Sequence, residues 1–111
     1  MTRTREIMRA TKENILHYLQ ELRAEVEKDG ITMLALFGSY AKGEETVYSD
    51  IDIAFSKNET FLNEGGAAKY FDIVGKMKEK IGKKFHRNVD IFDLNAQSPF
   101  KKSIEKELIY V

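Results

Sequence analysis

The sequence has no cysteine among its 111 residues, which excludes disulfide bonds and thiolate metal sites. It has no excess charge of either sign, because 18 basic residues balance 18 acidic ones, so no overall field would attract nucleic acid. It also has no apolar run near the roughly 18 residues of a membrane span, and its charged start lacks the apolar centre of a signal peptide. We therefore expect a cytoplasmic protein with no membrane association, for which nucleic acid is a disfavoured partner.

The length and composition predict a single globular domain. Apolar residues make up 42% of the chain, and 111 residues suffice for one core. The sequence shows no internal repeat, low-complexity segment or linker, so residues 1–111 are expected to form one domain. A homo-oligomer is compatible with these features.

Helical and strand patterns alternate along the chain. Apolar residues at steps of three and four predict helices, and short apolar runs bounded by glycine or polar residues predict strands. The expected order is a helix over about 9–28, a strand over 31–37, a short helix over 39–45 opening at Ser39 as its N-cap, a strand over 50–55, a loop over 56–66, a helix over 67–84, a strand over 89–94 and a helix over 100–107. This order predicts an α/β (α+β) fold with helices packed on a small mixed β-sheet.

Two aspartates lie one residue apart in the strand expected over 50–55. Residues i and i+2 of a strand point to the same face, so Asp50 and Asp52 project together while the neighbouring isoleucines enter the core. Two carboxylates repel each other unless a cation lies between them, and oxygen ligands suit Mg²⁺ or Mn²⁺. Asp90 has a similar setting in the strand over 89–94. If the two strands are neighbours, the three carboxylates can hold two ions about 3.5–4 Å apart, as in phosphoryl-type transfer.

Gly38 and Ser39 follow the first expected strand and supply features that suit an anion. Glycine lets the backbone approach a ligand closely, and a loop entering a helix presents free N–H groups. The serine hydroxyl adds a donor. Metal ions on one side and a phosphate cradle on the other make a nucleoside triphosphate the ligand that this pattern favours.

The segments GSYAKG (38–43) and SDIDI (49–53) resemble the signature of the nucleotidyltransferases related to DNA polymerase beta. That signature has Gly-Ser, a second glycine and, after a spacer, Asp-x-Asp, and a third aspartate follows in a strand such as VDIFDL (89–94). The likeness spans roughly residues 31–94. The length is that of the minimal nucleotidyltransferases, which resemble a bare catalytic domain, so the resemblance implies the nucleotidyltransferase fold.

The resemblance also implies a role for each matching position. Gly38 and Ser39 would bind the triphosphate of ATP, and Asp50 and Asp52 would ligate two Mg²⁺ or Mn²⁺ ions. Asp90 would complete the metal site and help to orient or deprotonate the attacking hydroxyl, which displaces pyrophosphate from the α-phosphate.

Lys42 occupies a position where many relatives carry arginine. Lysine can approach a phosphate but lacks the planar fork of arginine, so Lys42 is the matching position that departs most from the family pattern.

Minimal nucleotidyltransferases often accompany a helical HEPN-domain protein as a toxin–antitoxin pair. The resemblance therefore implies adenylylation of a tyrosine on such a toxin. Only residues 97–111 follow the matching segments, too few for a second substrate-binding domain, which also favours an acceptor on another protein.

Other interpretations of these residues are open. Asp50 and Asp52 could lie on a solvated strand edge, where charges discourage pairing. Asp93 is close to Asp90 in sequence but should point the other way, so we leave it out of the site. The protein could be a non-catalytic antitoxin that masks its partner by occlusion, or it could transfer nucleotides to RNA or to a small molecule such as an aminoglycoside.

Overall fold

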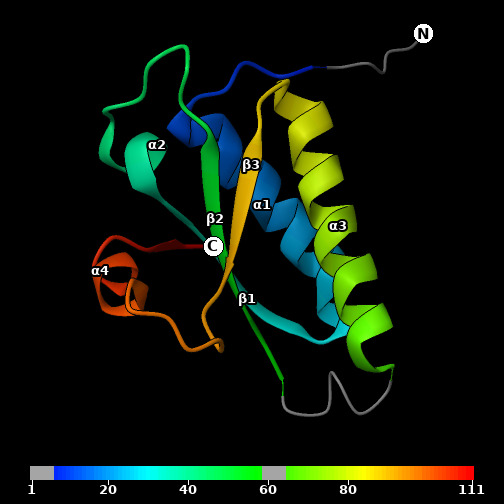
Figure 1. Ribbon diagram of the computed structural model, residues 1–111. Coiled ribbons are helices and arrows are strands. Elements are labelled where there is room, and N and C mark those ends of the chain that lie inside the picture. Colours follow the sequence, from blue (N-terminus) through cyan, green and yellow to red (C-terminus); the bar gives the residue numbers. More distant parts are fainter. Residues whose placement is uncertain (1–6, 59–64) are drawn as a thin grey trace, which may run out of the picture.

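The computed structural model describes residues 7–58 and 65–111 and has the expected mixed architecture (Figure 1). Part of the loop predicted over 56–66 falls in residues 59–64 and lies outside the described residues. In chain order the elements are α1 (Lys12–Val26), the 3-10 helix η1 (Glu27–Asp29), β1 (Ile31–Phe37), α2 (Gly38–Lys42), β2 (Ile51–Lys57), α3 (Gly66–Phe85), β3 (Val89–Asp93), α4 (Lys101–Glu105) and β4 (Ile109–Tyr110). None of the described helices is long and apolar enough to cross a membrane.

The four strands form one sheet in the order β3-β2-β1-β4. β1 pairs antiparallel with both β2 and β4, whereas β2 and β3 run parallel. A parallel pair needs a crossover connection, and α3 lies in the chain between β2 and β3. The prediction of a small mixed sheet is therefore confirmed.

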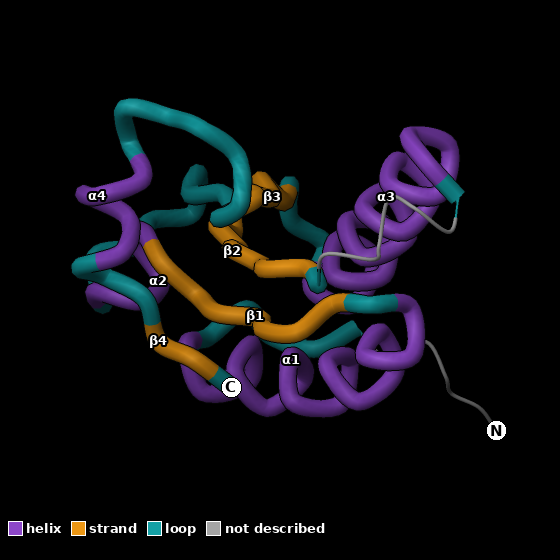
Figure 2. The backbone as a smooth tube through the Cα atoms, turned by 90° about the horizontal axis from the view of Figure 1, so that it is seen from below, coloured by secondary structure: helices purple, strands orange, loops and turns teal. Residues whose placement is uncertain are grey.

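Two long helices cover one face of the sheet. Figure 2 shows α1 and α3 on one side of the strands and α2 with α4 on the other. The rings of Tyr18 in α1 and Phe85 in α3 pack in a T-shaped arrangement, with their centroids 5.8 Å apart. The apolar stripe of α1 is buried as its spacing predicted, through Ile15, Leu19, Leu22 and Val26. Burial of this stripe against the sheet supplies much of the core.

Local signals explain where several elements begin and end. The hydroxyl of Thr11 caps α1 by accepting a hydrogen bond from the Asn14 N–H at 3.0 Å. Gly30 follows η1 with φ 99°, a left-handed conformation that glycine adopts readily. β1 has the predicted bounds, and α3 and β3 differ from prediction by one residue at their ends.

Some predicted boundaries were wrong. The short helix begins at Gly38, and no side chain caps it, so the predicted capping role of Ser39 is absent. β2 begins at Ile51, which places Asp50 just before the strand, and continues to Lys57. The last helix ends at Glu105 because the chain turns into β4, which has only two residues and no visible strand pattern.

Candidate active site

Strand pairing brings together the residues that the motifs singled out. In the parallel pair, Asp52 of β2 lies directly opposite Asp90 of β3. On the other side of β2, Asp52 pairs with Phe37, the residue before Gly38. The N–H of Ile51 donates to the carbonyl of Asn88 at 2.9 Å, which joins the beginnings of β2 and β3. The register thus sets Asp52 between the end of β1 and the start of β3.

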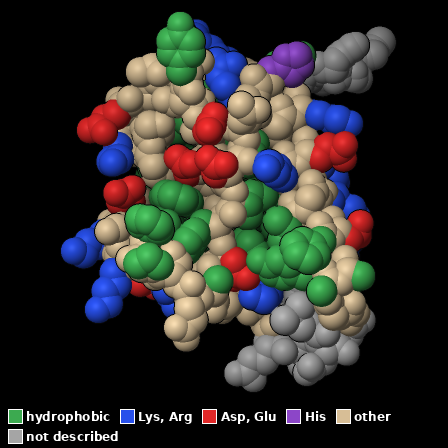
Figure 3. Space-filling view, viewed as in Figure 1, with side chains coloured by type: hydrophobic (Ala, Val, Ile, Leu, Met, Phe, Trp, Pro, Cys, Tyr) green, Lys and Arg blue, Asp and Glu red, His purple; other side chains and the backbone are tan. Residues whose placement is uncertain are grey.

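The side chains of β2 alternate between the core and the open face of the sheet. Ile51 and Ile53 are fully buried, whereas Asp52 between them is partly exposed. In β3, Asp90 is exposed and its neighbour Val89 is buried. Figure 3 shows acidic side chains gathered near the upper centre of this face, with apolar side chains below them. The predicted alternation is therefore present at the start of both strands, and β2 is then buried from Ile53 to Phe55.

Asp52 is the residue on which the electrostatics of the site converge. Its pKa is raised from 3.8 to about 6, chiefly by burial and then by the charges of Asp90, Asp50 and Glu107. Neighbouring carboxylates can exert such an effect only if they lie close in space. The three predicted aspartates therefore form one local acidic cluster, and its mutual repulsion would fall if a cation were bound.

Gly38 is packed so closely against this cluster that only glycine fits. It has φ +77°, and a Cβ at this position would lie 2.1 Å from Oδ2 of Asp52. A side chain at residue 38 would have to displace the carboxylate. Gly38 and Ser39 are partly exposed, so a ligand held beside the aspartates can approach the backbone at the end of β1.

Ser39 and Lys42 lie on α2, next to this approach. The hydroxyl of Ser39 has no hydrogen-bond partner among the described residues, so it is available as a donor. The Lys42 ammonium lies 3.6 Å from Oε2 of Glu107 and 4.0 Å from Oε1 of Glu44. Since Glu107 also raises the pKa of Asp52, Lys42 belongs to the same neighbourhood as the aspartates.

Glu107 is a site residue that the sequence did not reveal. It follows α4, where a glutamate is ordinarily interpreted as part of a solvated helix face. Only the folding of the chain from α4 into β4, which pairs with β1, brings it near Asp52. No spacing within the sequence signals this contact.

The donor set of the cluster suits a hard divalent cation. In the described ranges 7–58 and 65–111, no three Asp, Glu, His or Cys side chains already stand in a geometry that holds a metal ion. Mg²⁺ is usually bound by one or two carboxylates together with substrate phosphates, so a complete protein cage is not required. Asp50, Asp52 and Asp90 fit such a partial ligand set.

Asp93 has a structural role outside the acidic cluster, in agreement with the prediction that it points away from Asp90. Its carboxylate accepts hydrogen bonds from the Lys57 ammonium at 2.7 Å and from the Tyr70 hydroxyl at 2.9 Å. Tyr70 belongs to α3, and burial together with the Asp93 hydrogen bond raises the pKa of its phenol to about 12. Asp93 therefore joins β2, β3 and α3 and takes no part in the acidic cluster.

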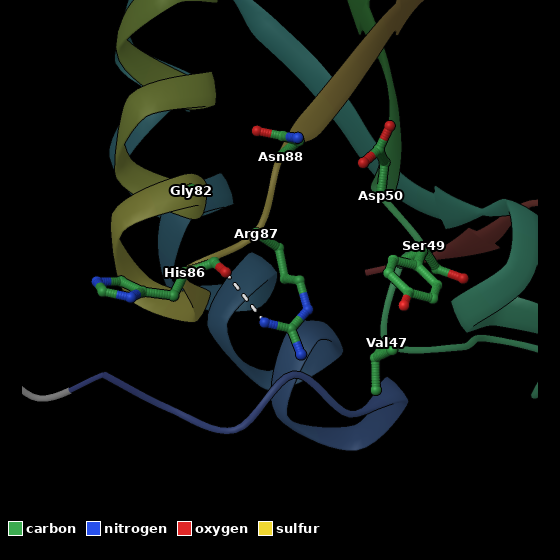
Figure 4. Close-up of a pocket in the computed structure, with 8 residues that line it drawn as sticks. Val47, Ser49, Asp50, Gly82, His86, Arg87 and Asn88 are labelled. Carbon is green, nitrogen blue, oxygen red and sulfur yellow. Dashed lines mark hydrogen bonds between the residues drawn. The ribbon is translucent and has the colours of Figure 1, made fainter.

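An open cleft of about 560 Å³ adjoins the cluster at Asp50. Figure 4 shows Val47, Ser49 and Asp50 on one side of it and His86, Arg87 and Asn88 on the other. Arg87 lines this cleft, although a basic residue that follows a lysine-rich helix is usually solvated. Tyr40 is buried, and its hydroxyl accepts a hydrogen bond from Nε of Arg87 at 3.3 Å.

Comparison with known sequences gives a consistent family. Residues 13–111 match the family described as "Polymerase beta, Nucleotidyltransferase". The chain is 38% identical over 87 residues to "Putative protein adenylyltransferase MJ1379" of Methanocaldococcus jannaschii, which covers 77% of this chain and 81% of the relative. It is 39% identical over 87 residues to "Putative protein adenylyltransferase MJ0128" of the same organism, with the same coverage of both chains.

Solved structures share the fold at low sequence identity. A structure described as "putative minimal nucleotidyltransferase" superposes with TM-score 0.67 and 20% identity, covering 90% of this chain and 95% of the other. A chain of a toxin–antitoxin complex with AMP-PNP gives TM-score 0.58 and 20% identity, covering 82% of this chain and 69% of the other. A chain of the complex between the tri-AMPylated HEPN toxin of Shewanella oneidensis and an MNT antitoxin superposes with TM-score 0.57 and 17% identity. The match covers 90% of this chain and 71% of the other.

Proposed function

Because the chain belongs to the polymerase beta nucleotidyltransferase family, we propose that it transfers AMP from ATP to a hydroxyl group of a partner protein and releases pyrophosphate. The observation that carries this proposal is the convergence of Asp50, Asp52 and Asp90 beside the close backbone approach at Gly38. The relatives in M. jannaschii bear the name of protein adenylyltransferases, which favours a protein over other acceptors.

In this proposal one part of the site binds the triphosphate and the other part binds the metal ions. The backbone at Gly38, the Ser39 hydroxyl and the Lys42 ammonium hold the triphosphate. Binding it requires Lys42 to exchange its carboxylate neighbours Glu44 and Glu107 for phosphate oxygens.

The aspartates Asp50, Asp52 and Asp90 hold two Mg²⁺ or Mn²⁺ ions. When bound, such ions neutralise the charge that develops on the phosphate oxygens and orient the reacting groups. The raised pKa of Asp52 supports this role, because a carboxylate crowded by like charges gains most from a cation.

The chemical step is an in-line displacement. The acceptor hydroxyl oxygen forms a bond to the α-phosphorus, and the bond from that phosphorus to the oxygen bridging the β-phosphate breaks. Pyrophosphate leaves with that oxygen, and the hydroxyl proton passes to the Asp90 carboxylate. Asp90 suits this role because it is exposed, so an acceptor on another molecule can reach it.

The proposed acceptor is a tyrosine of a HEPN-domain toxin encoded beside this protein. The support is the shared fold with the antitoxin complexes, one of which contains an AMPylated HEPN toxin. Silencing such a toxin by adenylylation would make this chain the antitoxin of the pair.

The test is incubation of the purified protein with α-labelled ATP, Mg²⁺ and the neighbouring HEPN-domain protein. We expect label on the partner, loss of labelling in Asp50→Asn and Asp52→Asn, and normal labelling in Asp72→Asn, which removes an exposed carboxylate from α3. An unlabelled partner would refute the proposal. If the two inactive variants still neutralised the toxin in cells, occlusion would be the function instead.

A further inference from the structure

The order of the strands fixes the direction from which an acceptor can approach. Gly38 follows β1, Asp52 lies in β2, and Asp90 lies beyond it in β3. In an in-line displacement, the attacking hydroxyl and the departing pyrophosphate lie on opposite sides of the α-phosphate. If the triphosphate binds against Gly38 at the β1 side, the hydroxyl has to arrive from the β3 side.

The cleft beside Asp50 opens on that side of the site. One wall comes from the loop before β2, and the other comes from the end of α3 and the turn into β3 (Figure 4). The hydrogen bond from Ile51 N–H to the Asn88 carbonyl holds the two walls together at their base. A volume of about 560 Å³ is within the range of ligand sites and can receive several side chains of a peptide.

Arg87 gives the cleft a preference for an anion. Its Nε donates to the Tyr40 hydroxyl at 3.3 Å and its Nη1 donates to the His86 carbonyl at 3.0 Å, so the guanidinium is held in place by neutral groups. Within the described parts of the chain, Arg87 forms no ion pair. A guanidinium has five N–H donors, so several remain for a carboxylate, which it binds through its planar fork.

An exposed apolar lip borders the same cleft. Val47 is 74% exposed and Tyr48 is 90% exposed, although both are large apolar or aromatic residues. Aromatic residues are enriched at protein interfaces. Val47 lies three residues before Asp50 and Tyr48 two residues before it, so a group that packs on these side chains is close to the acidic cluster.

Building on the proposed function, we infer that this cleft is the acceptor site. Its ligand is a protein segment that carries an acidic side chain close to the modified hydroxyl residue. The acidic side chain binds Arg87, and the apolar part of the segment packs on Val47 and Tyr48. The hydroxyl then reaches the α-phosphate between Asp50 and Asp90.

Peptide binding tests this inference without requiring catalysis. The probe is a fluorescein-labelled peptide with a central tyrosine flanked by glutamates, compared with the same peptide carrying glutamines, in the presence of AMP-PNP and Mg²⁺. Fluorescence polarisation should show roughly tenfold weaker binding of the glutamine peptide, because a charge-assisted hydrogen bond is lost. Arg87→Gln should weaken binding of the glutamate peptide by a similar factor and abolish the preference between the two peptides.

Matched variants separate recognition from folding. Lys83→Gln removes a positive charge from the exposed end of α3, and Phe71→Ala removes an exposed aromatic ring remote from the cleft, so both should bind the glutamate peptide normally. Tyr48→Ala should weaken binding several-fold. Because Tyr48 is exposed, this variant keeps the test decisive if loss of the Arg87–Tyr40 hydrogen bond unfolds Arg87→Gln.

Three other results would overturn the inference that the cleft is the acceptor site. Absent binding, or equal binding of both peptides, would show that the cleft does not recognise an acidic acceptor. An Arg87→Gln variant that binds AMP-PNP weakly and the peptide normally would assign the cleft to the nucleotide. Arg87-dependent binding of an RNA oligonucleotide in place of the peptide would assign it to RNA. Peptide binding without transfer of label to the peptide or to the partner protein would instead count against the proposed adenylylation alone.

Discussion

Replacing Asp52 by asparagine should stabilise the metal-free protein at mildly alkaline pH. Burial and the charges of Asp90, Asp50 and Glu107 raise the pKa of Asp52 from 3.8 to about 6. An ionised Asp52 is therefore unfavourable in the folded state, and the amide removes the charge at nearly constant shape. The variant would lose activity under the proposed mechanism and gain stability, the combination expected of a residue kept for function.

The sign follows from proton binding. Between the pKa of the unfolded chain, 3.8, and that of the folded protein, about 6, the folded protein retains a proton on Asp52 that the unfolded chain has released. Raising the pH through this window therefore lowers the free energy of unfolding of the wild type, and Asp52→Asn does not incur this loss.

The expected size is modest. The difference between the two pKa values corresponds to about 3 kcal/mol. Asp52 is partly exposed, so screening by solvent reduces this figure to about 1–2 kcal/mol.

Urea denaturation in EDTA, at about pH 8 and at about pH 4, measures the effect. We expect the free energy of unfolding of Asp52→Asn to exceed that of the wild type by about 1–2 kcal/mol at the higher pH and to equal it at the lower pH. Asp72→Asn is the control, because it removes a carboxylate from the exposed side of α3. Equal stabilities of wild type and Asp52→Asn at both pH values would refute the electrostatic account of the cluster.

Three further predictions address the site and its support. Mg²⁺ at about a hundred times its Kd should raise the free energy of unfolding of the wild type by about 2–3 kcal/mol, measured by urea denaturation at about pH 8. A similar gain in Asp52→Asn would contradict metal binding at this cluster. Gly38→Ala should lower the free energy of unfolding by about 1–2 kcal/mol, because alanine is strained in the left-handed conformation of this residue. The 2.1 Å clash of its Cβ with Asp52 should reduce adenylylation by about a hundredfold. A normal kcat would show that the close contact between residue 38 and Asp52 is not needed for activity. Asp93→Asn should lower the free energy of unfolding by about 2 kcal/mol, measured by thermal unfolding, because it weakens the contacts to Lys57 and Tyr70. Its activity per folded molecule should be unchanged, and a selective loss of activity would mean that Asp93 contributes to the chemistry.

The sequence predicted most of the fold because the main elements carry strong local signals. The stripe from Ile15 to Val26 has a helical period, and the run from Ile31 to Phe37 is short, apolar and bounded by glycines, as is typical of a buried strand. β4 could not be predicted, because two residues carry no period and the strand exists only through its pairing with Ala35 and Leu36 of β1. The capping role assigned to Ser39 was wrong because α2 begins at Gly38 and Phe37 occupies the N-cap position, so Ser39 lies inside the helix.

The site residues that the sequence predicted lie in recognisable patterns, whereas Glu107 and Arg87 do not. Asp50, Asp52 and Asp90 could be grouped from strand alternation and the likelihood that their strands are neighbours. Glu107 and Arg87 reach the site through α4 and the end of α3, where a charged residue gives the same signal as any solvated one. Their roles depend on tertiary contacts, which a linear pattern does not encode.

The alternation within β2 has a consequence for how this chain can vary. Because the core and the chemistry occupy opposite sides of the same strand, inserting or deleting one residue between Ile51 and Phe55 would exchange them, burying a carboxylate and exposing an isoleucine. The start of the loop before β2, from Gly43 to Glu45, has no such restriction on its length, because it precedes Val47 and Tyr48 of the proposed acceptor site. We therefore expect natural length changes to accumulate before β2 and to be absent within it.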